Sequence, residues 1–218
     1  MVSRGRFITL EGPEGAGKST HLKALAARLE AEGIPVLCTR EPGGTKLGEM
    51  VRNILQFDAA GESPVPRAEL LLFLASRAQL VHHVIEPALA RGEWVLSDRF
   101  CDSTFAYQGF GRGMNVVELQ AINGFATGGL MPDLTLLLDI PQDESQARVS
   151  SRKGPVDRFE QERESFHTRL AEGFRQLARE NPDRIHRIDS TGPQEATAAK
   201  IWEEVAPLVT SFNGGSLA

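Results

Sequence analysis

A glycine-rich stretch near the N-terminus carries the residue types that bind phosphate. Residues 12–19 read GPEGAGKS and match the pattern G-x-x-x-x-G-K-[ST], with Gly12, Gly17, Lys18 and Ser19 at its fixed positions. Glycines let successive backbone N–H groups point inward around an anion, and a helix that starts after the loop adds the positive end of its dipole. We expect Lys18 to reach the β- and γ-phosphates of a nucleoside triphosphate and Ser19 to help hold Mg²⁺. The predicted contacts of the triphosphate are the loop residues, namely Gly12, Pro13, Glu14, Gly15, Ala16, Gly17, Lys18, Ser19 and Thr20.

Charged residues follow two further apolar runs, where a parallel sheet would present its ligand site. Arg40 and Glu41 come after the run PVLCT, and Asp98 and Arg99 come after WVLS. Ligands of open α/β sheets bind outside the carboxyl ends of the strands, so we expect each pair to lie near the phosphates, with Glu41 among the substrate-binding residues. Asp98 is a better candidate than Asp139 for the acid on the magnesium side, because a guanidinium follows it directly. Asp139 is expected to be structural, and the N-K-x-D stretch that reads the base in a switch GTPase is absent.

Arg77 lies among apolar neighbours in a predicted helix. The residues three and four positions away in each direction are Phe73, Leu74, Leu80 and Val81. A desolvated charge needs an acceptor, so Arg77 either forms an internal salt bridge, extends past the helix edge into water, or meets a ligand. Phe73 favours the ligand, because a ring and a guanidinium at positions i and i+4 share one face and suit a flat base.

A charged segment with a Gly-Pro break covers residues 147–164. It reads ARVSSRKGPVDRFEQERE, and its cations include Arg148, Arg152, Lys153 and Arg158. A solvated surface loop would have this composition. A mobile lid would have it too, because a lid brings cations onto a transferring phosphoryl group and keeps water away from it. We expect a lid over about residues 147–164.

The elements that must position these residues alternate between short apolar runs and stretches of helical period. The runs are RFITLEG, IPVLCTRE, EWVLSDRF, LTLLLDI and RIHRIDS. This alternation predicts an α/β protein with an open, five-stranded parallel sheet and helices on both faces. With the glycine loop placed between the first strand and the first helix, the expected fold is that of the P-loop NTPases. Helices are predicted after the glycine loop up to Gly33, over residues 67–86 with an end near Pro87, and over residues 159–179.

Composition narrows the class of protein. The chain has 218 residues and a formal net charge of -5, which predicts one domain over residues 1–218 and argues against long nucleic acid as a partner. Cys38 and Cys101 lack the spacing of metal ligands and are expected to be reduced thiols packed in the interior. Since the N-terminus has no apolar signal core and no run approaches the length of a membrane span, a cytoplasmic location is predicted.

Six segments of the sequence resemble the thymidylate kinase family, P-loop enzymes that phosphorylate dTMP with ATP. They are, in the order of the family, FITLEGPEGAGKST, TREPGGT, LLFLASRAQ, SDRFCDSTFAYQGFGRG, PDLTLLLDIP and DRFEQE. The resemblance covers nearly the whole chain, and a chance phosphate loop would not bring the other five segments with it. It implies dTDP as the product, ATP and Mg²⁺ as requirements, and a homodimer packed through long helices such as that at 67–86.

The resemblance also implies roles for residues of the nucleoside site. Phe73 would stack on thymine, and Arg77 would bond the edge of the base. Thr104 and Gln108 would line the base and sugar site, and Tyr107 would crowd the 2′ position and so favour deoxyribose.

For phosphate binding, the resemblance implies three arginines and two acidic residues. Arg99, with Arg40 and Arg52, would bind the phosphate of the acceptor. Glu11 and Asp98 would organise Mg²⁺ and the attacking oxygen.

The source of the catalytic cation follows from the loop. Gly15 stands where one subgroup of the family has an arginine, so the sequence resembles the bacterial-type subgroup that supplies this cation from the lid. Arg152 and Arg158 are the candidates, and Arg148 would lie over adenine.

Two other functions remain open from the sequence. A P-loop kinase of another nucleoside monophosphate or of a deoxynucleoside would share the loop and the lid. A non-catalytic module that binds ATP to fix an interaction surface would also share the loop, but it would leave Phe73, Arg77 and the lid cations without a purpose.

Overall fold

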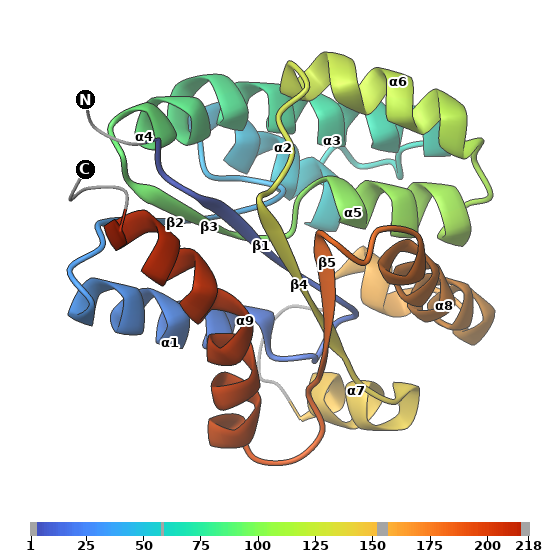
Figure 1. Ribbon diagram of the computed structural model, residues 1–218. Helices are drawn as coiled ribbons and strands as arrows, with labels where there is room; N and C mark the ends of the chain where they lie inside the picture. Colours follow the sequence, from blue (N-terminus) through green and yellow to red (C-terminus); the bar gives the residue numbers. More distant parts are fainter. Residues whose placement is uncertain (1–3, 58, 152–156, 215–218) are drawn as a thin grey trace.

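A five-stranded parallel sheet forms the centre of the protein (Figure 1). The computed structural model describes residues 4–57, 59–151 and 157–214. The strand order is β2-β3-β1-β4-β5, and the strands are β1 (Phe7–Glu11), β2 (Val36–Arg40), β3 (Trp94–Asp98), β4 (Leu134–Asp139) and β5 (Ile185–Asp189). All five predicted strands are confirmed, and so is the predicted α/β fold with a parallel sheet.

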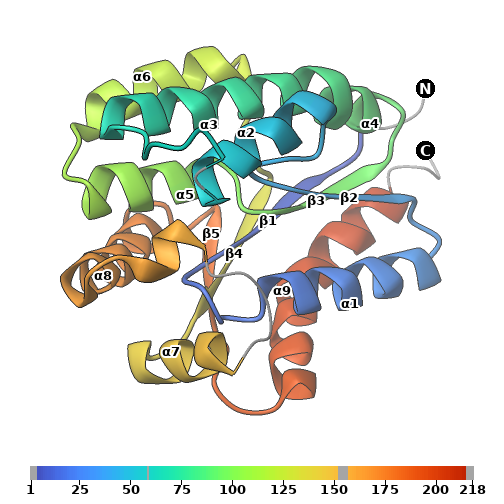
Figure 2. The same ribbon diagram turned by 180° about the vertical axis from the view of Figure 1, so that it is seen from behind.

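Helices cover both faces of the sheet, as expected (Figures 1 and 2). One face is covered by α1 (Lys18–Ala31) and α9 (Gln194–Gly214). The other is covered by α8 (Glu164–Glu180) and by two helices that each continue into a wide-turn segment. These are α3 (Pro66–Leu80), which runs through η1 (Val81–Ile85) into α4 (Glu86–Ala90), and α5 (Cys101–Thr104), which runs into η2 (Phe105–Gly111).

Four further elements complete the described chain. Helices α2 (Lys46–Phe57) and α6 (Val116–Thr127) lie beside α3 on the outer side of the molecule (Figure 2). Helix α7 (Gln142–Ser150) follows β4, and the 3₁₀ turn η3 (Arg158–Gln161) precedes α8. None of the four was predicted as a separate element. No helix among the described residues is both long enough and apolar enough to span a bilayer.

Side chains of the central strands alternate between the two layers of helices. On β1, Ile8 and Leu10 pack with the α1 and α9 side, whereas Phe7 packs with α3 and α4, and all three are fully buried. On β4, Leu136 faces α1 and α9, and Leu137 faces α8. Strands covered on both faces are apolar at successive positions, which is why these runs read as continuous apolar stretches in the sequence.

Two predicted helix boundaries are wrong. The helix expected to end near Pro87 continues to Ala90, because the wide turns of η1 shift the hydrogen-bond ladder and leave Pro87 in the first turn of α4, where no N–H is needed. The helix expected over residues 159–179 is divided into η3 and α8 by Arg163, whose extended backbone (φ -62°, ψ 151°) interrupts the helical turn.

The two cysteines lie in different surroundings. Cys101 is buried, as predicted, but Cys38 is exposed, because it lies on the edge strand β2. The expectation of an interior thiol is therefore wrong for Cys38.

Candidate active site

The glycine loop joins β1 to α1 and curls around the ammonium group of Lys18. Gly17 precedes the helix with φ 89°, and Gly12 has φ 133° with so little space that a Cβ would lie 2.3 Å from the carbonyl oxygen of Leu138. The Nζ atom of Lys18 donates to the carbonyl oxygens of Gly12 (3.1 Å) and Pro13 (2.7 Å). Burial, followed by the nearby guanidinium of Arg99, lowers the pKa of Lys18. The loop therefore holds its cation at the edge of a cavity.

The larger of two adjoining cavities is lined by most of the residues predicted for phosphate binding, and we call it the phosphate cavity. Ser19 and Asp98 lie side by side in it, with Ser19 Oγ donating to Asp98 Oδ2 at 2.5 Å. Strand register explains the grouping, because Arg40 at the end of β2 pairs with Asp98 at the end of β3. The predicted residues that line this cavity are Glu14, Gly15, Gly17, Lys18, Ser19, Thr20, Arg40, Glu41, Arg52, Asp98, Arg99 and Arg148.

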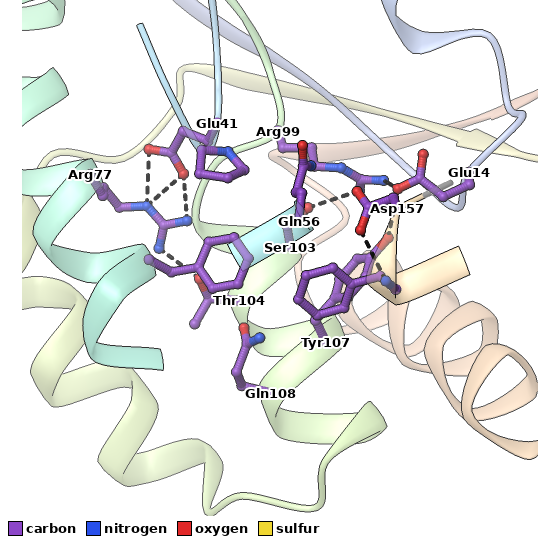
Figure 3. A pocket seen from close by; sticks show the side chains of 13 residues that line it. Glu14, Glu41, Gln56, Arg77, Arg99, Ser103, Thr104, Tyr107, Gln108 and Asp157 are labelled. Atoms are coloured by element: carbon purple, nitrogen blue, oxygen red, sulfur yellow. Dashed lines mark hydrogen bonds and ion pairs between the residues drawn. The ribbon is translucent and has the colours of Figure 1, made fainter. Parts of the chain in front are cut away.

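A second, smaller cavity adjoins the phosphate cavity and is lined by the residues predicted to bind the nucleoside (Figure 3). We call it the nucleoside cavity. It lies between α3, α5 with η2, and the turn η3. Its lining is largely aromatic on one side, where Phe73 and Tyr107 face Phe159 at ring-centroid distances of 5.9 and 5.6 Å from it. The predicted residues that line it are Glu14, Glu41, Phe73, Arg77, Arg99, Thr104, Tyr107 and Gln108.

Arg99 lies at the junction of the two cavities and lines both. Its backbone has φ 74°, a left-handed conformation that side chains other than glycine seldom adopt and that recurs at functional sites. Its guanidinium donates to Glu14 Oε1 (2.5 Å), to the carbonyl oxygen of Gly12 (3.0 Å) and to Ser103 Oγ (3.1 Å). Burial would raise the pKa of Glu14, but the charges of Arg99 and Lys18 outweigh it and lower this pKa to about 2.

Arg77 is buried and uses all five of its N–H groups within the protein. Nε and Nη2 donate to Glu41, at distances down to 2.5 Å, and Nη2 also donates to the carbonyl oxygen of Phe100 (3.0 Å). Nη1 donates to Thr104 Oγ1 (2.7 Å) and to Asn123 Oδ1 (2.6 Å). The internal salt bridge, one of the alternatives left open by the sequence, is thus present, while Arg77 still lines the nucleoside cavity.

Glu11 lies behind the cavities and lines neither of them. Its carboxylate accepts hydrogen bonds from the Phe100 N–H (2.7 Å), from the Ser103 N–H (3.3 Å) and from Ser103 Oγ (2.6 Å). Burial, and then the charge of Asp102, raise its pKa from 4.5 to about 7. In this arrangement Glu11 holds the start of α5, and among the described residues its hydrogen bonds go to Phe100 and Ser103 rather than to Ser19 or Asp98.

The predicted lid is described in part. Arg148 on α7 lines the phosphate cavity and donates to the carbonyl oxygens of Ser190 (3.2 Å) and Gly15 (3.4 Å). Arg158 does not line the phosphate cavity, and it donates to Glu69 Oε2 (2.7 Å) and to the carbonyl oxygen of Leu55 (3.1 Å). Arg152, the other candidate for the catalytic cation, lies outside the described residues.

Several residues at the site were not predicted from the sequence. Asp157 lines both cavities and caps η3 by accepting from the Phe159 N–H, and burial raises its pKa from 3.8 to about 6. Ser103 bridges Glu11 and Arg99. His21 lies against the loop, where a Cβ at Gly17 would be 3.2 Å from its ring. Asp157 and Phe159 belong to the segment DRFEQE, in which the sequence predicted a role only for Arg158.

The residues at the phosphate cavity suit Mg²⁺ better than a metal held by protein alone. In the parts of the chain that the structure describes, no group of three or more His, Cys, Asp or Glu side chains could hold a metal ion. Mg²⁺ is usually bound through one or two protein oxygens, with phosphate and water as the other ligands. Ser19 and Asp98 offer such a pair beside the glycine loop.

Comparisons with known proteins agree with this geometry. A family model described as Thymidylate kinase matches residues 10–201. The chain is 50% identical over 209 residues to a thymidylate kinase of Synechococcus sp. (strain JA-2-3B'a(2-13)), covering 96% of this chain and 98% of the relative. It is 46% identical over 216 residues to that of Alkalilimnicola ehrlichii, with 99% of both chains covered. The crystal structure of thymidylate kinase from Ehrlichia chaffeensis matches with a TM-score of 0.74 and 33% identity, over 93% of this chain and 99% of that one. With its phosphate loop and adjoining nucleoside cavity, the chain belongs to the thymidylate kinase family, ATP-dependent phosphotransferases that convert dTMP to dTDP.

Proposed function

We propose that the two adjoining cavities hold ATP and dTMP with their phosphates facing each other at Arg99. The observation that carries this proposal is that Arg99 lines both cavities, beside the cation of the glycine loop. A kinase must hold the γ-phosphorus of its donor and an oxygen of its acceptor in line and in contact. A guanidinium at the junction can bond both anions at once.

On the donor side, we propose that the glycine loop binds the phosphates of ATP. Backbone N–H groups between Glu14 and Thr20 face the β-phosphate, and Lys18 turns from the loop carbonyls to the β- and γ-phosphates. Arg148, which lines the same cavity beyond the loop, lies over adenine. The helix α1 adds its positive end to this anion site.

On the acceptor side, we propose that Arg40, Arg52 and Arg99 bind the phosphate of dTMP. Arg40 and Arg52 both line the phosphate cavity, and burial, followed by the charge of Arg40, lowers the pKa of Arg52. A dianionic phosphate would relieve this repulsion. Arg40 would then exchange its exposed pairing with Glu49 for the substrate.

For the nucleoside, we propose that Phe73 stacks on thymine and that Tyr107 lies at the 2′ position of the sugar. Thr104 and Gln108 meet the polar edge of the base. Because all five N–H groups of Arg77 are engaged, its contribution to recognition includes orienting Thr104 while Glu41 holds it in place.

The transfer itself needs positioning and charge neutralisation more than proton transfer. An ionised oxygen of the dTMP phosphate attacks the γ-phosphorus, a new P–O bond forms, and the bond to the β-phosphate oxygen breaks to leave ADP. A phosphate monoester is already largely ionised at neutral pH, so no strong general base is required. Lys18 and Arg99 lie where negative charge spreads over the transferring group.

We propose that Ser19 and Asp98 hold Mg²⁺ together with the phosphates. When bound, the ion would neutralise part of the negative charge of the phosphates. Glu11 would support the site from behind through Ser103 and Arg99. The earlier expectation that Glu11 itself organises the ion stays a prediction.

We propose a single domain over residues 1–218 with a lid over about residues 147–164. Arg152 and Arg158 remain the candidates for the lid cation. Arg158 would have to leave Glu69 to reach the phosphates, which favours Arg152.

The test is transfer of phosphate by the purified chain, with ATP and Mg²⁺, to a panel of dTMP, dCMP and AMP. Turnover is expected with dTMP, and turnover of dCMP or AMP without dTMP would overturn the function. Arg99→Gln is expected to lower kcat/KM for both ATP and dTMP. Arg91→Gln removes an exposed arginine paired with Glu93 and serves as the matched control. A loss confined to one substrate in Arg99→Gln would contradict the meeting of the phosphates at this residue.

We also propose that the protein is a homodimer formed through α2, α3 and α6. These helices carry most of the large apolar side chains that stay exposed in the described chain, namely Leu47, Met50, Phe57, Leu71, Val116, Val117, Ile122 and Phe125. The cytoplasmic location expected from the sequence remains a proposal that cell fractionation would test.

A further inference from the structure

A buried carboxylate behind the nucleoside cavity joins the base site to the turn η3. Glu69 lies in the first turn of α3, and its side chain is 1% exposed. Its oxygens accept from Gln108 Nε2 (3.0 Å), from Arg112 Nη2 (3.1 Å) and from Arg158 Nη2 (2.7 Å). Glu69 does not line the nucleoside cavity, whereas Gln108 does (Figure 3).

Glu69 decides which end of the Gln108 amide can face the base. A carboxylate offers only acceptors, and two guanidinium groups hold this one in place, so the NH₂ end of the amide must point toward it. The Gln108 carbonyl oxygen is left without a hydrogen-bond partner among the described residues. Gln108 therefore presents an acceptor to the cavity, and this assignment follows from the chemistry of Glu69.

Thr104 lines the same cavity, and its hydroxyl offers a hydrogen-bond donor where Gln108 offers an acceptor. Arg77 has only donors, and its Nη1 donates to Thr104 Oγ1 at 2.7 Å. The hydroxyl proton of Thr104 is then free to point elsewhere. The two side chains thus give the cavity one acceptor, from Gln108, and one donor, from Thr104.

This pattern matches one kind of pyrimidine edge. Thymine presents N3–H as a donor beside carbonyl acceptors, whereas cytosine presents N3 as an acceptor beside an amino donor. The carbonyl of Gln108 would bond N3–H of thymine and would oppose the N3 lone pair of cytosine. We propose that Glu69 is a positioning residue for base choice, which fixes the Gln108 amide in the orientation that accepts a hydrogen bond from the base. This inference rests on the proposed placement of the base in this cavity.

The test compares dTMP with 5-methyl-dCMP, because both carry the methyl group and they differ only at the polar edge. In Glu69→Gln, the new amide can donate or accept, so the Gln108 amide can turn over. The ratio of kcat/KM for dTMP over that for 5-methyl-dCMP is expected to fall by on the order of tenfold, mainly by gain of the cytosine substrate. The ratio is independent of the fraction of folded enzyme. If both substrates lose activity equally, Glu69 is merely structural and the inference is overturned.

Matched variants separate this role from others. Glu162→Gln removes the other carboxylate partner of Arg112, at 2.6 Å, without touching Gln108, and it is expected to leave the ratio unchanged. In a Gln108→Leu background, Glu69→Gln is expected to cause no further change, and a further change would overturn the inference. Should Glu69→Gln fail to fold, Glu69→Asp keeps the charge for both arginines but withdraws it from Gln108, and the ratio is again expected to fall.

The failure of the inference and that of the base placement give different results. If Gln108→Leu lowers the ratio but Glu69→Gln and Glu69→Asp do not, only the role of Glu69 is overturned. If Gln108→Leu itself leaves the ratio unchanged, the base does not meet Gln108, and the placement fails together with the inference.

Discussion

Lys18 shows at the level of one residue how the glycine loop keeps a cation ready for phosphate. Its ammonium group is bonded to two carbonyl oxygens of the loop and is 6% exposed. Lys18→Ala is expected to lower kcat by on the order of 10²–10³-fold, because one preorganised donor to the transferring group is lost. Steady-state kinetics with ATP and dTMP would measure this.

The matched control for Lys18 lies on the same helix. Lys23 is exposed on α1 and takes no part in the cavities, so Lys23→Ala is expected to keep wild-type kcat. Thermal unfolding of both variants checks that the fold is intact. A wild-type turnover number in a folded Lys18→Ala enzyme would contradict the role given to the loop.

The raised pKa of Glu11 predicts that the stability of the protein depends on pH. Its pKa is raised to about 7 in the folded state from 4.5, so between these values the folded state binds more protons than the unfolded state, and the free energy of unfolding falls as pH rises. Glu11→Gln keeps the shape and one oxygen that accepts from the Phe100 and Ser103 N–H groups, but it cannot ionise. The stability of this variant relative to wild type is therefore expected to increase from pH 5 to pH 8, as measured by urea unfolding.

Glu14 supplies the control for this pH profile. Its pKa is lowered to about 2, so its contribution to stability is present above 4.5 and is lost only as pH falls toward 2. Glu14→Gln is therefore expected to differ from wild type by a constant amount between pH 5 and pH 8. A constant difference for Glu11→Gln as well would show that its carboxyl does not titrate in this range.

The spacing of residues in the sequence predicted which side chains line the site. It did not predict which groups form hydrogen bonds with them. Phe73 and Arg77 line one cavity, as positions i and i+4 of a helix require. The acceptors of Arg77, such as Glu41 and Asn123, lie 36 and 46 residues away along the chain. Helical period carries no information on contacts of that range, so the saturation of the guanidinium could not be predicted.

At the level of elements, the packing of α8 against η2 depends on a glycine inside the helix. A Cβ at Gly173 would lie 2.6 Å from the ring of Phe110, whereas a Cβ at Gly124 in α6 would meet nothing within 4 Å. Helix propensity favours alanine over glycine at both positions. Gly173→Ala is nevertheless expected to destabilise the protein by about 1–3 kcal/mol through overpacking.

Gly124→Ala is the matched change in an open position. It is expected to raise the free energy of unfolding by up to about 1 kcal/mol, because propensity acts there without a clash. Denaturant unfolding of the two variants measures both effects. Equal stabilisation by both changes would show that α8 and η2 can separate without cost.

Two helix boundaries differ from those that the apolar and charge patterns of the sequence predicted. Pro87 ends a helix only when its missing N–H and its ring disturb a regular ladder, and the wide turns of η1 remove that conflict. The charged run at 159–179 has helical composition throughout, but Asp157 caps a separate 3₁₀ turn at its start. The first outcome depends on backbone hydrogen bonds that the sequence does not specify, whereas the second is marked by the capping-box spacing of Asp157 and Glu160.

At the level of the whole molecule, the order of the strands brings together segments that are distant in the sequence. Strand β1 lies between β3 and β4, so the glycine loop after β1 lies beside Asp98 and Arg99 after β3. The run-by-run alternation of strands and helices predicted this sheet and the end at which ligands bind. The alternation could not predict η3, which follows β4 and α7 in the chain and places Phe159 in the lining of the nucleoside cavity.

The outer layer of the molecule predicts its oligomeric state. Leu71 on α3 and Phe125 on α6 are 63% and 91% exposed, and the helices α3 and α6 lie on the side of the sheet opposite α9 (Figure 1). Apolar patches of this kind mark interfaces, and a second copy of the chain would cover the same patch on both molecules. Light scattering after size exclusion is expected to give twice 23.8 kDa for the wild type and a monomer for the double variant Leu71→Asp, Phe125→Asp. Thr210→Asp places one such charge at an exposed position of α9, and this variant is expected to stay dimeric. A monomeric wild type, or a dimer that survives the double variant, would contradict an interface on α3 and α6.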